Sequence, residues 1–254
     1  MDLQYLDPST ARVLDGWTSP ILGQAMPIVA YGHWGHPLLL FPTAAADYLE
    51  NERFFLIQSI EPAIRAGRVR VFSINSINSQ AWMDRGLPVA EQARRQALYA
   101  RYVEEEVVPY IRRVCQTADL RIGASGASFG GFHAANTVFR RPELFDSLIA
   151  MSGFFDLAPD YLHGYSDDNV YFNNPAWYLE GMDGNSLHLL RTACKLLVMS
   201  GQGDYEAPDA SRRLSELLHR KGIPHQLDLW GHDMPHDWPT WRKMLPHAID
   251  LLGW

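Results

Sequence analysis

Short apolar runs alternate along the chain with segments whose apolar residues are spaced as in a helix. The run "HPLLLFPT", His36 to Thr43, is apolar and ends near a proline, which predicts a buried strand. Residues Glu50 to Gly67 have helical spacing and end in glycine, which predicts a helix. The run "RVRVFSIN", Arg68 to Asn75, is rich in β-forming residues and predicts the next strand.

The same alternation continues to the end of the chain. Further strands are predicted at 146–153, 195–204 and 225–232, and further helices at 88–115, 132–145, 207–222 and 237–252, with Pro109 as a point where the first of these helices could break. Strands that alternate with helices indicate an α/β fold with a mostly parallel central sheet and helices on both faces.

One segment does not follow this pattern. Residues 154–190 form a different region, since Phe154 to Asn185 are rich in Tyr, Asp, Asn, Trp and Gly, and we predict no regular element there. They lie between two predicted strands, so we expect a loop-rich excursion that shapes a pocket. We expect residues 1–254 to form a single domain, since one α/β domain of this size is common.

Composition and charge narrow the class of protein. The net charge of −7 provides no surplus of basic side chains to neutralise phosphates, which argues against a nucleic-acid partner. The two cysteines, Cys115 and Cys194, form no disulfide framework or C-x-x-C site. No apolar run approaches the roughly 20 residues of a membrane span, and the N-terminus lacks the pattern of a secretory signal. We therefore expect a cytoplasmic protein that does not associate with a membrane.

The stretch "GASGASFGG", Gly123 to Gly131, holds two serines in a row of small residues. Ser128 fits the pattern G-x-S-x-G, with Gly126 and Gly130 on either side, whereas Ser125 does not, because Ala127 stands where the second glycine is needed. A predicted strand precedes this pattern and a helix follows it, which is the context of a nucleophile elbow. A simple glycine-rich turn is the alternative.

A serine that attacks a carbonyl also needs donors for the oxyanion that forms. We expect the first donor to be the backbone N–H of Phe129, directly after the serine. The second should come from the loop after an earlier strand, here "FPTAAADY", with Thr43 as the first choice and Ala44 as the alternative.

In folds with a nucleophile elbow of this kind, the chain order is Ser, then an acid, then His. Asp204 follows the strand-like run "LLVMSGQG" and is the predicted acid. Glu206 and Asp209 are nearby competitors for this role. The alternative for Asp204 is a purely structural role in the turn.

The base should lie between the last strand and the last helix, where "WGHDMPHDWPTW" holds His232 and His236. Neutral imidazole suits a base near neutral pH. Asp237 is a suitable helix N-cap, so His236 should be fixed at the start of the last helix, and we favour it. A metal site formed by these histidines and Asp233 is disfavoured, because Pro235 argues against their lying on one face of a helix and no further ligand has recognisable spacing.

With these pieces in place, the chain resembles the esterase D-like branch of the α/β-hydrolases, which includes feruloyl and acetyl esterases, S-formylglutathione hydrolase and the mycolyltransferases. The resemblance covers nearly the whole chain and is carried by "GRVRVFSINSINSQAW", "YVEEEVVPYIR", "GASFGGFHAAN", "MSGFFDL", "VYFNNPAWYL" and "HDWPTWRKMLP". It implies the α/β-hydrolase fold, with Ser128 as nucleophile, His236 as base and Asp204 as acid. One departure stands at the oxyanion loop, where relatives often carry "HG" and this chain has Phe41-Pro42.

The sequence thus predicts a serine carboxylic-ester hydrolase that acts on a small-molecule ester through an acyl-enzyme and needs no cofactor and no metal. Acyl transfer by the same triad, or a catalytically silent binding protein on the same fold, are the alternatives. Trp82 and Trp238 are candidate substrate-binding residues.

Overall fold

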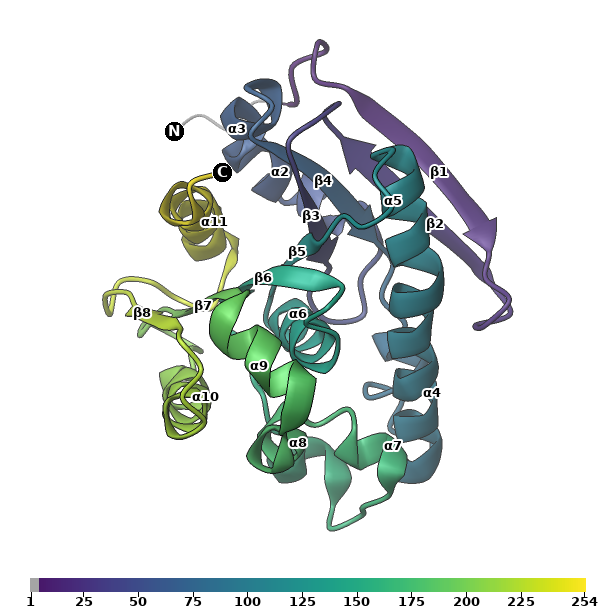
Figure 1. Ribbon diagram of the computed structural model, residues 1–254, viewed down its shortest axis with the longest axis vertical. Coiled ribbons are helices and arrows are strands. Elements are labelled where there is room, and N and C mark those ends of the chain that lie inside the picture. The colour runs from purple at the N-terminus through teal and green to yellow at the C-terminus, as the bar shows by residue number, and fades with distance from the viewer. Residues whose placement is uncertain (1–4) are drawn as a thin grey trace.

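The computed structural model describes residues 5–254, whose strands form one eight-stranded sheet with the order β1-β2-β4-β3-β5-β6-β7-β8 (Figure 1). All neighbouring strands from β4 to β8 run parallel, whereas β1 and β2 form an antiparallel hairpin and β2 is antiparallel to β4. The strands span β1 Arg12–Thr18, β2 Ala25–Tyr31, β3 His36–Phe41, β4 Val69–Ile74, β5 Ile122–Ala127, β6 Phe145–Met151, β7 Lys195–Ser200 and β8 Gln226–Leu229. The predicted α/β class and mostly parallel sheet are confirmed, and the N-terminal hairpin is an addition that the sequence pattern did not predict.

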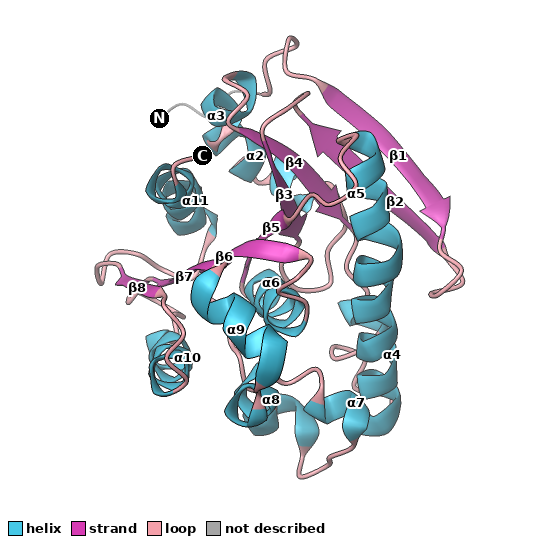
Figure 2. Ribbon diagram, viewed as in Figure 1, coloured by secondary structure: helices cyan, strands magenta, loops and turns pink. Residues whose placement is uncertain are grey.

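Helices cover both faces of the sheet (Figure 2). One face packs against α2, α3 and α11, and the other against α4, α5, α6, α9 and α10. The helices span α1 Glu50–Arg53, α2 Leu56–Ser59, α3 Glu61–Arg65, α4 Val89–Tyr102, α5 Val108–Val114, α6 Phe129–Arg140, α7 Asp168–Tyr171, α8 Pro175–Gly181, α9 Gly184–Thr192, α10 Pro208–Arg220 and α11 Trp238–Leu252. The apolar strands β3 to β7 are buried between these layers, as expected of parallel strands.

Two predicted helices are divided in the structure. The helix predicted at 50–67 forms three short helices, because Phe55 takes a left-handed conformation with φ 62° between the first two. The helix predicted at 88–115 contains a π-helical turn, Val103–Val107, which ends two residues before Pro109. Proline has no N–H and clashes with the preceding turn, and the wider π turn accommodates it without ending the helix.

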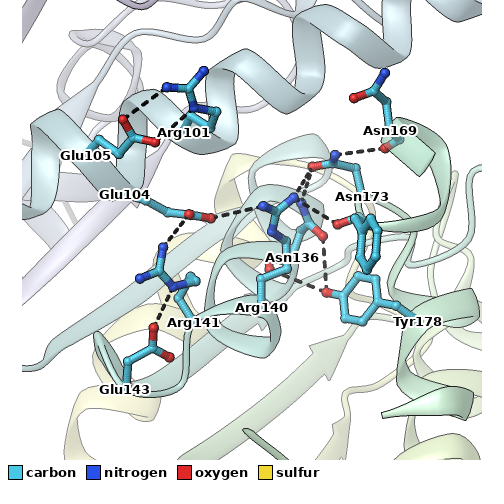
Figure 3. Close-up of polar contacts among 11 residues, drawn as sticks. Arg101, Glu104, Glu105, Asn136, Arg140, Arg141, Glu143, Asn169, Asn173 and Tyr178 are labelled. Atoms are coloured by element: carbon cyan, nitrogen blue, oxygen red, sulfur yellow. Dashed lines mark hydrogen bonds and ion pairs between the residues drawn. The ribbon is translucent and has the colours of Figure 1, made fainter.

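The excursion after β6 is more regular than predicted, since it contains α7, α8, α9 and a π-helical turn at Ala158–Leu162. A polar network fastens it to the body of the protein (Figure 3). The Glu104 carboxylate lies 3.3 Å from Arg140 and 2.5 Å from Arg141, and Arg140 also donates to Asn173 at 3.0 Å. The buried side chain of Asn136 donates to Asn173 at 3.1 Å. These bonds join α6 to the segment between α7 and α8.

No helix in the described part of the chain, residues 5–254, has the length and apolar character needed to cross a membrane.

Candidate active site

Ser128 is the single residue between the end of β5 and the start of α6, and its backbone has φ 56° and ψ −121°. A non-glycine residue in this region is strained, and such strain is concentrated at functional turns. The turn requires glycine at Gly126, because a Cβ there would lie 2.4 Å from the backbone carbon of Gly130. Ser125, by contrast, lies within β5 and is fully buried. The predicted strand–serine–helix turn is therefore present, with Ser128 at its apex.

His236 comes from the loop between β8 and α11, and its ring faces a carboxylate. Its Nδ1 lies 3.4 Å from Oε2 of Glu206, which comes from the loop after β7. The side chain of Glu206 is 1% exposed, whereas that of His236 is 26% exposed. A buried carboxylate thus holds one ring nitrogen of a histidine whose other side remains accessible.

Several donors hold the Glu206 carboxylate. Ser152 Oγ donates to Oε1 at 2.6 Å, Ser200 Oγ donates to Oε2 at 3.2 Å, and the N–H of Gly201 donates to Oε1 at 3.2 Å. Burial opposes the charge, but the hydrogen bonds with His236 and Ser152 outweigh it and lower the pKa of Glu206 below its usual value. Glu206 is therefore ionised near neutral pH and oriented toward the imidazole.

The structure differs from the sequence prediction at the acid, because Asp204 does not face the imidazole. Its side chain is exposed, and its contribution to His236 is a backbone one, since the Asp204 carbonyl accepts the N–H of His236 at 2.9 Å. The chain turns back at Tyr205, whose φ is 62°, and the N–H of Glu206 donates to the Gly203 carbonyl at 3.2 Å. This turn directs the side chain of Glu206, rather than that of Asp204, toward the end of the sheet.

The two candidate histidines differ in their surroundings. His232 is exposed, and its Nδ1 lies 3.2 Å from the carbonyl oxygen of Gln202. His236 directly precedes Asp237, whose side chain accepts the N–H of Trp238 at 2.7 Å and caps α11. The capped helix fixes the backbone next to His236, as expected from the sequence.

Contacts along the ends of the strands connect the serine turn to the carboxylate. The N–H of Ser128 donates to the carbonyl of Met151 at 3.0 Å, and the next residue, Ser152, donates to Glu206. Among the described residues, 5–254, no hydrogen bond joins the Ser128 hydroxyl to His236. In enzymes that pair a serine with a histidine, such bonds often form only when a substrate is bound.

The candidate oxyanion donors also differ in their surroundings. Phe129 is the first residue of α6, so its N–H has no acceptor within the helix. The N–H of Thr43, however, donates to Oε2 of Glu50 at 2.7 Å. The carbonyl oxygen of Pro42, which belongs to the same peptide group as the Thr43 N–H, lies only 2.7 Å from the position that a Cβ on Gly130 would occupy. Because the C=O and N–H of one trans peptide point in opposite directions, the Thr43 N–H points away from α6.

This orientation does not fit the prediction that Thr43 is the second oxyanion donor. The alternative, Ala44, is the next residue, and its N–H makes no hydrogen bond within residues 5–254. Glu50 itself is buried, and burial raises its pKa despite the hydrogen bonds from Thr43.

The two tryptophans predicted to bind substrate lie in different environments. Trp82 is 1% exposed and belongs to an apolar cluster with Leu157 and with Phe129, the residue after Ser128. Trp238 is half-buried and stacks on Phe54 with their ring centroids 4.7 Å apart. Of the two, only Trp238 presents a surface that a substrate could contact without rearrangement.

Within the described residues, 5–254, no group of three or more His, Cys, Asp or Glu side chains is arranged so that it could hold a metal ion. The three residues considered as ligands, His232, Asp233 and His236, form no such group, and His232 and Asp233 are exposed.

Solved structures share this architecture. A ferulic acid esterase is similar with a TM-score of 0.74 and 18% identity, over 96% of this chain and 98% of that one. A fluorophosphonate-binding serine hydrolase of Staphylococcus aureus has a TM-score of 0.72 and 16% identity, over the same shares. An S-formylglutathione hydrolase of Staphylococcus aureus has a TM-score of 0.68 and 17% identity, again over 96% and 98%.

The sheet order, the serine turn and these similarities show that the chain has the α/β-hydrolase fold. A comparison with curated protein sequences found no match. The family model described as "Putative esterase" matches residues 68–251, which include Ser128, Glu206 and His236. The chain belongs to this esterase family and is therefore an enzyme.

Proposed function

We propose that this protein hydrolyses a small-molecule carboxylic ester through an acyl-enzyme, with Ser128 as nucleophile, His236 as general base and acid, and Glu206 as the acid of the triad. The observation that carries the proposal is the strained Ser128 turn at the same end of the sheet as His236 and the buried Glu206 carboxylate that contacts it. The similarity to a ferulic acid esterase and an S-formylglutathione hydrolase supports an ester or thioester of modest size.

The proposed reaction has two steps. With Glu206 accepting the Nδ1 proton of His236, the Nε2 atom is free to take the proton of the Ser128 hydroxyl as its oxygen attacks the ester carbonyl. The tetrahedral intermediate collapses, His236 gives the proton to the leaving alcohol, and the acyl group stays on Ser128. Water, deprotonated by His236, then attacks the acyl-enzyme and releases the carboxylic acid.

The negatively charged oxygen of each intermediate needs donors fixed in advance. We propose that the N–H groups of Phe129 and Ala44 provide them, in place of the pair of Phe129 and Thr43 expected from the sequence. Ala44 is preferred because the Thr43 N–H already donates to Glu50 and points away from α6. Removing one such donor costs about 10²- to 10³-fold in turnover in hydrolases of this kind.

The test is a pair of serine substitutions. Ser128→Ala should lose nearly all turnover of p-nitrophenyl butyrate and all labelling by a fluorophosphonate probe. Ser125→Ala is the matched control, since Ser125 lies three residues before Ser128 in the buried strand β5, and this variant should keep most of both. Labelling of Ser125, or activity that survives Ser128→Ala, would contradict the proposal.

A further inference from the structure

The loop that carries Ala44 is held on two sides. On one side the N–H of Thr43 donates to Oε2 of Glu50 at 2.7 Å. On the other, the carbonyl oxygen of Ala44 accepts from Asn78 Nδ2 at 2.8 Å and from Ser76 Oγ at 3.2 Å. The peptide between these anchors carries the Ala44 N–H. With both neighbouring peptide groups fixed, the direction of this N–H is fixed as well.

Asn78 is itself held by a buried histidine. It is 0% exposed, and its Oδ1 lies 2.8 Å from Nε2 of His133, which is 2% exposed. Burial lowers the pKa of His133 to about 3, so the ring is neutral near pH 7. Since the Asn78 amide nitrogen donates to Ala44, its oxygen is the acceptor here, and His133 donates from Nε2.

The histidine belongs to the same helix as the serine turn. His133 lies in α6, which begins directly after Ser128. Its ring packs against Phe41, Tyr99 and Phe129, with centroid distances of 5.8, 5.2 and 5.9 Å. These contacts fix the imidazole, so the chain of donors His133 to Asn78 to Ala44 links the nucleophile helix to the loop after β3.

We propose that Asn78 is a positioning residue for the second oxyanion donor: held by His133, it fixes the Ala44 N–H relative to Ser128. This inference rests on the proposed function. Its consequence is kinetic, because an oxyanion donor acts on the transition state more than on the bound substrate. Loss of the Asn78 bond should therefore lower kcat and leave KM nearly unchanged.

The main test is Asn78→Asp, which preserves shape. The carboxylate can still accept from His133, but it cannot donate to the Ala44 carbonyl and repels it. We expect kcat for p-nitrophenyl butyrate to fall about 10- to 100-fold, with KM changed less than about threefold. Binding of butylboronic acid, which forms a tetrahedral anionic adduct with the serine, should weaken by a similar factor.

Asn136→Asp is the matched control. Asn136 is also a buried asparagine, lies on α6, and donates its Nδ2 to Asn173 at 3.1 Å, far from the oxyanion loop in sequence (Figure 3). The variant Asn136→Asp should lower the melting temperature as Asn78→Asp does, but the kcat of its folded fraction should equal that of the original protein. A purely structural role for Asn78 would make the two variants alike, and that result overturns the proposal.

If Asn78→Asp does not fold, Ser76→Ala carries the test. Ser76 is half-buried and provides the longer, weaker bond to the same carbonyl. We expect a three- to tenfold fall in kcat, and an unchanged kcat would overturn the proposal. Ser128→Ala separates the two hypotheses: if it stays active, the proposed function fails, whereas an inactive Ser128→Ala beside a fully active Asn78→Asp defeats the positioning role alone.

Discussion

Oε2 of Glu206 lies 3.4 Å from Nδ1 of His236, although the two residues come from different loops at the end of the sheet. The loops are packed closely: the Gly203 N–H donates to the Met234 carbonyl at 2.9 Å, and a Cβ on Gly201 would lie 2.1 Å from the same oxygen. The pair is therefore set by backbone contacts as well as by the side chains, and the distance between carboxylate and imidazole has little freedom.

Glu206→Gln should lower kcat by roughly three to four orders of magnitude with the fold intact. The amide cannot stabilise the imidazolium and favours the wrong imidazole tautomer, as with the equivalent substitution in other triads. Turnover of p-nitrophenyl butyrate measures the effect, and circular dichroism checks the fold.

Asp204→Asn is the control for this prediction. Its side chain is exposed, and its contact with His236 is through the backbone, which the substitution preserves. We expect activity within about threefold of the original, because the backbone contact is kept and a substitution at an exposed position usually changes stability by no more than about 0.5 kcal/mol. A large loss in Asp204→Asn beside an active Glu206→Gln would return the acid to Asp204.

The position of the acid illustrates what the sequence could not provide. Asp204 and Glu206 both follow β7, and the choice between them depends on the turn at Tyr205, whose positive φ is not typical of tyrosine. The strand–serine–helix turn was predictable because its glycines and flanking periodicity are local features. Thr43 failed as a predicted donor for a non-local reason, since its N–H is taken by Glu50 of the following helix.

The parallel sheet was predictable for the same local reason, because each strand is a short apolar run between helical patterns. The β1–β2 hairpin was missed because β1 is mostly exposed and has no buried apolar run to reveal it. Its register depends on pairing with β2 rather than on its own pattern.

His236→Ala should be nearly inactive as a folded protein, because the loss of the base removes both proton transfers. Losses of about a millionfold in turnover occur when the histidine of a comparable triad is removed. His232→Ala should keep at least a few per cent of the activity, since His232 is exposed and contacts the carbonyl of Gln202 instead. Turnover of a short-chain ester ranks the two variants, and an inactive His232→Ala beside an active His236→Ala would reverse the assignment.

Ser152→Ala should destabilise the protein more at pH 7 than at low pH. Ser152 donates to Glu206 and accepts from Trp241 Nε1 at 3.0 Å. The pKa of Glu206 is lowered in the folded state, so its contribution to stability is present above the unfolded value and is lost as the pH falls through the folded value. A hydrogen bond to a charged group contributes about 1.5–3 kcal/mol, which sets the expected loss at pH 7.

Urea unfolding at pH 7 and near pH 3.5 measures this difference. Part of the cost remains at low pH, since Trp241 Nε1 loses its acceptor in both conditions. Ser200→Ala, which removes the longer bond of 3.2 Å to the same carboxylate, should show a smaller effect of the same sign. Equal losses at both pH values for Ser152→Ala would mean that the charge of Glu206 is not stabilised by this bond.

His133 should make the protein acid-labile. Its pKa is lowered to about 3 by burial, so the folded state keeps the ring neutral while the unfolded state binds a proton below the ordinary value of 6.5. A lowered folded-state pKa gives stability that is present above 6.5 and is lost progressively as the pH falls toward 3. At pH 5 the loss from this one residue is about 2 kcal/mol relative to pH 7.

The variant His133→Phe removes this loss of stability at low pH, although its free energy of unfolding at pH 7 is lower because Asn78 loses its donor. The quantity to compare is therefore the change in unfolding free energy between pH 7 and pH 5, which should be about 2 kcal/mol smaller in His133→Phe than in the original protein. His188→Phe, at an exposed position on α9, is the matched control and should leave that change as it was. The same pH dependence in His133→Phe and the original protein would show that the pKa of His133 is not lowered in the folded state, contrary to the effect expected from its burial.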